Sequence, residues 1–138
     1  MTVVTAFDAD VLIYAVSPTS PYGMRIRQFF EDPHTVPVGS VLLLPEVLAK
    51  PRRRDSFSRE VAELESLLSR ISLLPLDRAA GQIALEFATR YRLRGADATH
   101  LATAVIAGAD QFLTTNRKDF PQTIAEITVV YPEDLPHR

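Results

Sequence analysis

The chain has 138 residues, 46% of them hydrophobic, and a formal net charge of −2. This length suits a single domain over residues 1–138 with a hydrophobic core and is too short for two ordinary domains. The lack of cysteine excludes disulfides and thiolate zinc sites, and the slightly acidic balance argues against a histone-like nucleic-acid binder.

Membrane and targeting signals are missing from the sequence. No apolar run approaches the roughly 20 residues that a helix needs to cross a bilayer. The first residues carry neither a basic leader nor a small-residue cleavage site, so we expect a cytoplasmic protein with no membrane partner. The histidines, His34, His100 and His137, are scattered, and any metal is therefore expected to have oxygen ligands.

Apolar, β-branched runs alternate with stretches of helical periodicity along the sequence. The runs predict strands at 3–7, 35–38, 71–76, 111–115 and 127–131. The stretches predict helices at 10–16, 21–32, 41–50, 56–70, 77–92 and 97–108. This alternation predicts an α/β fold, a three-layer α/β/α sandwich around a central, mainly parallel sheet.

Several local features refine these boundaries. Pro51 and the arginines after it are expected to end the helix 41–50, so that Asp55 or Ser56 caps the next helix. That next helix is amphipathic, because Val61, Leu64, Leu67, Leu68 and Ile71 recur at spacings of three and four. The tail after Tyr131 contains two prolines and is expected to be irregular.

Three carboxylates stand at the ends of apolar runs that are far apart in the sequence. Asp8 follows the first predicted strand, Glu46 lies early in the third predicted helix, and Asp97 opens the last one. Asn116 and Asp119 follow the fourth predicted strand. Ligands bind at the carboxyl ends of strands in open α/β sheets, so we expect Asp8 and Asn116 to share one crevice.

A cluster of such carboxylates implies a cation. Bringing two of them within about 4 Å costs roughly 4 kcal/mol at an effective dielectric constant near 20. A divalent metal removes this repulsion, and oxygen ligands without His or Cys suit Mg²⁺ or Mn²⁺. Such a metal lowers the pKa of bound water and stabilises charge on a phosphoryl group, so the chemistry indicated is metal-assisted phosphodiester hydrolysis.

Basic residues cluster near the acidic positions. The clusters are Lys50, Arg52, Arg53 and Arg54; Arg90, Arg92 and Arg94; and Arg117 and Lys118. An acidic centre with a basic rim suits a polyanion that must approach metal-bound carboxylates. The alternative is that these side chains are simply solvated helix ends and loops.

Each acidic position also has an ordinary structural interpretation. An isolated Asp97 would more often be a helix N-cap than a ligand, and Asp10 is also interpreted as a cap. Glu46 could be an exposed helix residue, although its neighbours are mostly apolar. His100, one turn after Asp97 among apolar residues, is interpreted as a core or boundary histidine rather than a ligand.

The order of the motifs resembles the PIN-domain ribonucleases. They are FDADVLIYAV, LLLPEVLAK, RGADATHLATAV and FLTTNRKDF, and they span Asp8 to Asp119. The length fits a stand-alone toxin of the VapC type. The resemblance maps the family's acidic positions onto Asp8, Glu46, Asp97 and Asn116. The neutral Asn116 departs from the all-acid pattern, and Asp119 is the alternative source of the missing charge.

The resemblance implies a Mg²⁺- or Mn²⁺-dependent endoribonuclease that cleaves structured RNA, often tRNA or ribosomal RNA. It also implies a small antitoxin protein as partner, and a homodimer. The implied catalytic residues are Asp8, Glu46, Asp97, Asn116 and Asp119, of which the first three would bind the metal. The implied phosphate contacts are Arg52, Arg53, Arg54, Arg94, Arg117 and Lys118.

Two other functions remain open on the sequence alone. Asn116 is compatible with a weak or inactive PIN-like domain whose task is protein association. The FDADV segment also resembles the opening of haloacid-dehalogenase-type phosphotransferases, in which Asp8 would be the nucleophile. That family needs an isolated lysine and a late acidic pair, and the sequence offers only Lys50 and Lys118 and no convincing pair.

Overall fold

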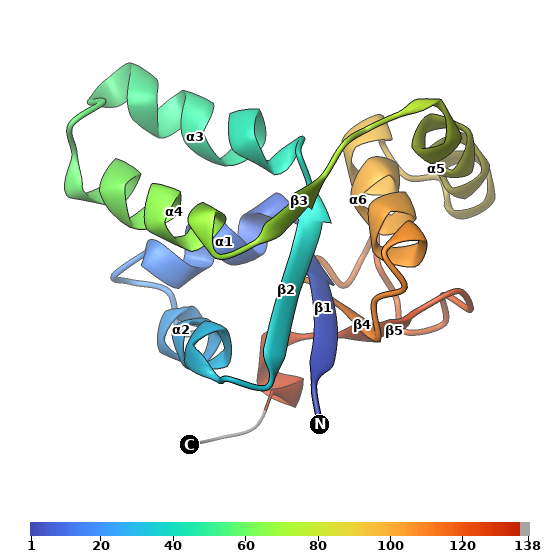
Figure 1. Cartoon of the computed structure of the whole chain (residues 1–138), viewed down its shortest axis with the longest axis horizontal. Coiled ribbons are helices and arrows are strands. Elements are labelled where there is room, and N and C mark those ends of the chain that lie inside the picture. The colour runs from blue at the N-terminus through green and yellow to red at the C-terminus, as the bar shows by residue number, and fades with distance from the viewer. Residues whose placement is uncertain (136–138) are drawn as a thin grey trace.

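Five strands form one sheet in the computed structural model, which describes residues 1–135 (Figure 1). Their order across the sheet is β3-β2-β1-β4-β5, and every neighbouring pair is parallel. The strands are β1 (Val3–Phe7), β2 (Thr35–Ser40), β3 (Ser72–Leu74), β4 (Gln111–Leu113) and β5 (Thr128–Val130). The predicted α/β fold is therefore confirmed, with a sheet that is entirely parallel.

Helices cover both faces of this sheet and complete the predicted three layers (Figure 1). One layer contains α1 (Ala9–Val16), α2 (Gly23–Glu31), α3 (Leu43–Arg54) and α4 (Arg59–Ser69). The other contains α5 (Arg78–Tyr91) and α6 (Gly95–Ile106). None of the helices in the described part of the chain is long and apolar enough to cross a membrane.

The hydrophobic core has two halves, one on each face of the sheet. In β4, Phe112 packs into the half under α5 and α6, whereas Leu113 packs into the half under α1 to α4. In β1, Ala6 and Phe7 divide in the same way, as expected from the alternation of side chains along a strand. A shift of either strand by one residue would exchange the two faces, so burial fixes the register.

Two predicted helix boundaries between α3 and α4 are wrong. Helix α3 continues through Pro51, which is buried: the proline removes the one hydrogen bond that its own N–H would make, the helix extends to Arg54, and the N–H of Asp55 donates to the Pro51 carbonyl at 3.0 Å. Asp55 instead accepts from the N–H of Phe57 at 3.0 Å. The cap of α4 is Ser58, whose Oγ accepts from the N–H of Val61 at 3.1 Å.

Two other local predictions have different outcomes. The amphipathic face predicted for α4 is confirmed, since Val61, Leu64, Leu67 and Leu68 are all buried. The tail is more ordered than predicted, because Pro132–Asp134 form a short 3₁₀ helix. Residues 136–138, the end of that tail, lie outside the described residues.

The order of the strands determines where a site can form. The chain moves outward from β1 through β2 to β3 and then returns to place β4 on the other side of β1. The β1/β4 boundary is therefore the point at which the winding of the sheet reverses. In open α/β sheets the crevice at the carboxyl end of this point is the usual ligand site.

Candidate active site

Asp8 is a buried carboxylate at the carboxyl end of β1. It precedes α1 at the N-cap position, and only 4% of the residue is exposed. Its Oδ2 accepts a hydrogen bond of 2.6 Å from the Thr114 hydroxyl, whereas its Oδ1 is buried with no hydrogen-bond partner among the described residues. Burial raises the pKa of Asp8 to about 7, although the Thr114 hydrogen bond opposes this rise. Asp10, predicted to be a cap, instead lies exposed in the first turn of α1.

Thr114 links the ends of β1 and β4. The pairing of Phe7 with Leu113 places the next residues, Asp8 and Thr114, opposite each other. The Thr114 Oγ1 donates to Asp8 and also accepts from the N–H of Asn116 at 3.0 Å. Thr114 was missed in the sequence interpretation, although a hydroxyl one residue beyond a strand that pairs with β1 is a usable signal.

Asn116 and Asp119 form a reciprocal pair in the loop after β4. The Asn116 Nδ2 donates to Asp119 Oδ2 at 2.9 Å, and the Asp119 N–H donates to Asn116 Oδ1 at 3.2 Å. Asn116 therefore holds the Asp119 carboxylate in a fixed orientation. The two residues, which were alternatives for one position in the sequence interpretation, are joined in the structure.

Asp97 lies in the first turn of α6 and is partly buried. The N-cap of this helix is Arg94, so the interpretation of Asp97 as the cap is wrong. Burial is the largest cause that raises the pKa of Asp97, and the negative charge of Asp119 is the next. Glu46 also raises this pKa, while His100 and Arg94 lower it. Side chains from α3, α6 and the loop after β4 thus share one electrostatic neighbourhood.

Glu46 and His100 contact each other across the two helical layers. Glu46 lies in the first turn of α3, with 31% of its side chain exposed. His100 lies on α6, with 1% of its side chain exposed, and its Nε2 is hydrogen-bonded to Glu46 Oε1. His100 is buried as expected, but its bond to a site carboxylate was missed. Its spacing of three residues from Asp97 was the available signal.

The donor set fits a hard divalent metal ion. The buried, unpartnered Oδ1 of Asp8 is the kind of acceptor for which a cation accounts, and the nearby carboxylates supply further oxygen ligands. Within residues 1–135, no three acidic or histidine side chains stand close enough together to enclose an ion.

A cleft of about 680 Å³ lies elsewhere, between α1, α2 and α4. Its lining includes Val16, Arg27, Glu63 and Arg70, and it contains none of the acidic residues of the site.

The arginines at the end of α3 are mostly engaged with α4. Arg52 pairs with Glu65 at 3.1 Å, and Arg54 pairs with Glu60 at 3.3 Å. Both pairs are exposed, so they are weak and can open for a ligand. Arg94 differs, because its charge lies close enough to Asp97 to lower the pKa of that carboxyl, against the larger effect of burial.

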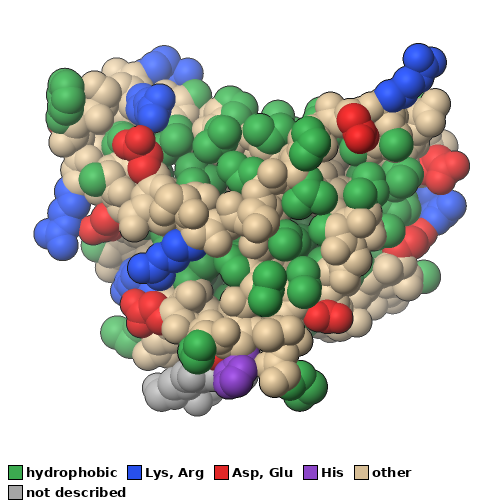
Figure 2. Space-filling model, in the orientation of Figure 1, with side chains coloured by type: hydrophobic (Ala, Val, Ile, Leu, Met, Phe, Trp, Pro, Cys, Tyr) green, Lys and Arg blue, Asp and Glu red, His purple; other side chains and the backbone are tan. Residues whose placement is uncertain are grey.

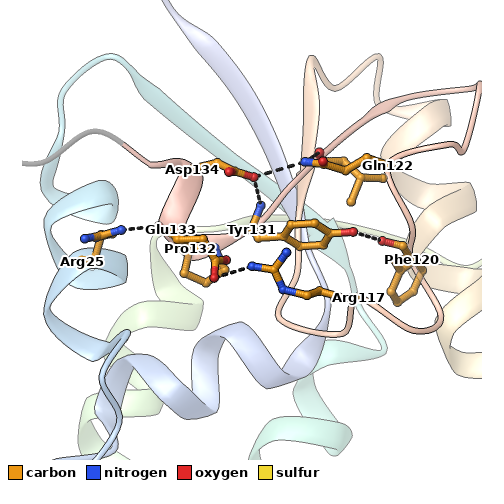
Figure 3. A network of polar contacts seen from close by, with 9 residues as sticks. Arg25, Arg117, Phe120, Gln122, Tyr131, Pro132, Glu133 and Asp134 are labelled. Carbon is orange, nitrogen blue, oxygen red and sulfur yellow. Dashed lines mark hydrogen bonds and ion pairs between the residues drawn. The ribbon is translucent and has the colours of Figure 1, made fainter.

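The C-terminal segment holds the loop that contains Arg117 and Phe120 (Figure 3). The Arg117 guanidinium lies 4.2 Å from the centre of the Tyr131 ring and pairs with Glu133. The Tyr131 hydroxyl donates to the Phe120 carbonyl at 2.8 Å. Arg117 thus contributes to the structure of the loop, whereas its exposed neighbour Lys118 remains accessible.

Three solved structures with this fold are a toxin–antitoxin complex, a VapBC complex and a VapC toxin. A toxin–antitoxin complex from Klebsiella pneumoniae matches with a TM-score of 0.70 and 22% identity, covering 95% of this chain and 98% of that one. A DNA-bound VapBC complex from Salmonella typhimurium matches with a TM-score of 0.72 and 18% identity, covering 96% and 99%. VapC20 from Mycobacterium tuberculosis, a sarcin–ricin loop cleaving toxin, matches with a TM-score of 0.67 and 14% identity, covering 91% and 98%.

At these identities the likeness establishes the fold. No curated protein sequence matches the chain significantly. The sequence model of the PIN domain matches residues 6–125, a range that begins before Asp8 and extends past Asp119. This chain therefore belongs to the PIN-domain family.

Proposed function

We propose that the protein is a Mg²⁺- or Mn²⁺-dependent endoribonuclease, the toxin component of a VapBC-type pair. PIN domains are typically nucleases, and PIN-domain nucleases generally use a divalent metal. The observation that carries the proposal is the buried Asp8 carboxylate, whose Oδ1 has no partner in the described part of the chain. It lies at the switch point of the sheet, where a ligand is expected.

The acidic residues divide into metal ligands and a supporting fourth position. Asp8, Glu46 and Asp97 would hold the metal, which when bound activates water and stabilises charge on the phosphoryl group. Thr114 orients Asp8 through its 2.6 Å hydrogen bond. Asp119 supplies the fourth acidic charge. Asn116 holds the Asp119 carboxylate, and the charge of Asp119 is the second-largest cause, after burial, that raises the pKa of Asp97.

Metal dependence provides the direct test of this function. The purified protein is expected to cleave structured RNA with Mg²⁺ or Mn²⁺, to lose cleavage when EDTA is added, and to recover it with excess Mn²⁺. Cleavage is measured on end-labelled tRNA and ribosomal RNA. Asp97→Asn, purified in parallel, is expected to be inactive and reports contaminating nucleases. An EDTA-insensitive rate would overturn the metal mechanism, and no cleavage of any RNA would favour the inactive binding module.

Arg94 is the basic residue best placed for an RNA phosphate near the metal. We expect Arg94→Gln to weaken RNA binding and to reduce the slope of log affinity against log salt by about 0.7 to 0.9, the value for one phosphate contact. Affinity is measured with catalytically inactive Asp97→Asn protein between low and moderate salt.

Replacing Arg52, Arg53 and Arg54 with glutamine provides the comparison for Arg94. If these residues contact phosphates as the sequence suggests, the triple variant also flattens the salt dependence. Because Arg52 and Arg54 pair with glutamates of α4, the loss per residue is expected to be smaller than for Arg94. An unchanged slope for Arg94→Gln would assign that side chain to the solvated surface.

The proposed partners are a small antitoxin and a second copy of the chain. The Klebsiella pneumoniae structure is a toxin–antitoxin complex, and the Salmonella typhimurium structure is a VapBC complex, which supports an antitoxin here. An apolar surface supports the proposed homodimer: Figure 2 shows hydrophobic side chains gathered across the middle of one face. Exposed apolar residues of the elements near that face include Val41, Leu44, Leu76 and Leu85.

A further inference from the structure

The contact between Glu46 and His100 joins two elements that lie on opposite faces of the sheet. Glu46 belongs to α3, which packs with α1 and α4, whereas His100 belongs to α6, which packs with α5 (Figure 1). The bond runs from His100 Nε2 to Glu46 Oε1. It is therefore a cross-layer contact made at the site itself.

The two partners differ in how firmly each is held. The His100 side chain is 1% exposed, so the packing of α6 fixes its ring, while the Glu46 side chain is 31% exposed. A free glutamate has several rotatable bonds, and fixing such a side chain costs rotamer entropy. The bond to a buried ring provides the constraint that packing does not give to Glu46.

The other ring nitrogen of His100 defines the direction of this bond. Nδ1 is buried and has no hydrogen-bond partner among the described residues. Within residues 1–135 the ring therefore makes a single polar contact, and a carboxylate oxygen can only accept in it. His100 Nε2–H is the donor and Glu46 Oε1 is the acceptor. The other carboxylate oxygen of Glu46, Oε2, takes no part in this bond.

We propose that His100 is a positioning residue that orients the Glu46 carboxylate for the divalent metal. This inference rests on the proposed function to the extent that Glu46 is taken as a metal ligand. Groups that orient metal ligands contribute through those ligands, and their loss typically weakens metal affinity or activity by about 10- to 100-fold. His100 thereby acts on the metal without contacting it.

Two substitutions at this position separate the hydrogen bond from packing. His100→Leu keeps a buried apolar volume and removes the donor, whereas His100→Gln provides an amide N–H at nearly the distance of Nε2. We expect His100→Leu to weaken Mn²⁺ binding by about tenfold or more and His100→Gln to restore most of that loss. Binding is measured without RNA, from the electron paramagnetic resonance signal of free Mn²⁺, on protein shown to be folded by circular dichroism.

Thr103→Val is the matched control. Thr103 lies one turn further along α6, is 2% exposed, and has a buried hydroxyl with no partner in the described part of the chain. Its replacement changes a buried polar group of the same helix without touching a site carboxylate. Mn²⁺ affinity is expected to be unchanged in this variant, and a loss equal to that of His100→Leu would overturn the proposal.

A double-mutant cycle tests whether His100 acts through Glu46. Glu46→Ala removes the ligand, so adding His100→Leu to it is expected to cause no further loss of Mn²⁺ affinity. Additive losses would overturn the proposal. The readout also separates it from the proposed function: normal Mn²⁺ binding by His100→Leu overturns the positioning role even if the enzyme cleaves RNA. Conversely, absence of cleavage with the expected affinities overturns the nuclease function and supports the positioning role.

Discussion

Replacing Asp8 with asparagine is expected to abolish RNA cleavage while the protein stays folded. Asparagine has nearly the same shape, and its side-chain oxygen can still accept the hydrogen bond that Thr114 donates to Asp8. What it loses is the negative charge at Oδ1, the buried atom that has no partner within residues 1–135. Because electrostatic stabilisation is usually the largest catalytic contribution, we expect a loss of roughly 10³-fold or more in kcat.

Single-turnover cleavage of an RNA substrate at saturating Mn²⁺ measures this effect. Glu86→Gln is the matched control, since Glu86 is an exposed carboxylate of α5 that lies outside the proposed site. It should cleave at the wild-type rate. Retention of more than about a tenth of the activity in Asp8→Asn would contradict the assignment of Asp8 as a metal ligand, because a ligand cannot lose its charge at so small a cost.

The layers of the fold could be predicted from local pattern alone. All five strands and all six helices were predicted near their observed positions, because burial of a parallel sheet on both faces produces continuous apolar runs. The errors occurred where a single local rule was applied without its context. Pro51 was expected to end a helix, but helix α3 continues past it to Arg54, and the Pro51 ring is buried.

The site was only partly predictable, because some of its contacts join residues that are far apart in the sequence. Asp8 was identified because it directly follows a strand. Its partner Thr114 is 106 residues away, and the partner of Glu46 is 54 residues away, so each bond is recognised only once the pairing of distant elements is considered. The fourth position was presented as a choice between Asn116 and Asp119. In the structure the two residues are hydrogen-bonded to each other, one amide holding one carboxylate, a relation that composition and spacing do not reveal.

The stability of the metal-free protein is expected to fall as the pH rises from about 4 to about 7. Burial raises the pKa of Asp8 from 3.8 to about 7 in the folded state. Below the unfolded pKa, the Asp8 carboxyl is protonated in both the folded and the unfolded state. Its contribution to the stability of the folded state is then fully present. As the pH rises toward the folded pKa, the Asp8 carboxyl ionises in the unfolded chain but stays protonated in the folded protein, so the free energy of unfolding falls.

The size of this loss follows from the shift itself. One pKa unit corresponds to about 1.4 kcal/mol, so the Asp8 carboxyl alone accounts for about 4 kcal/mol between pH 4 and pH 7. Asp97, whose pKa burial also raises, contributes in the same direction. Other groups titrate in this range as well, and comparison with a variant that lacks only the Asp8 charge removes their contribution.

Urea unfolding at several pH values in EDTA measures the effect in wild type and in Asp8→Asn. The difference in unfolding free energy between the two proteins should grow in favour of Asp8→Asn as the pH rises and level off above pH 7. Mn²⁺ should reverse this order, since a bound cation stabilises the ionised carboxylate and adds its binding free energy to the folded state. A difference independent of pH would mean that the Asp8 carboxylate is ionised at little cost without metal, and its unpartnered oxygen would then no longer indicate a cation site.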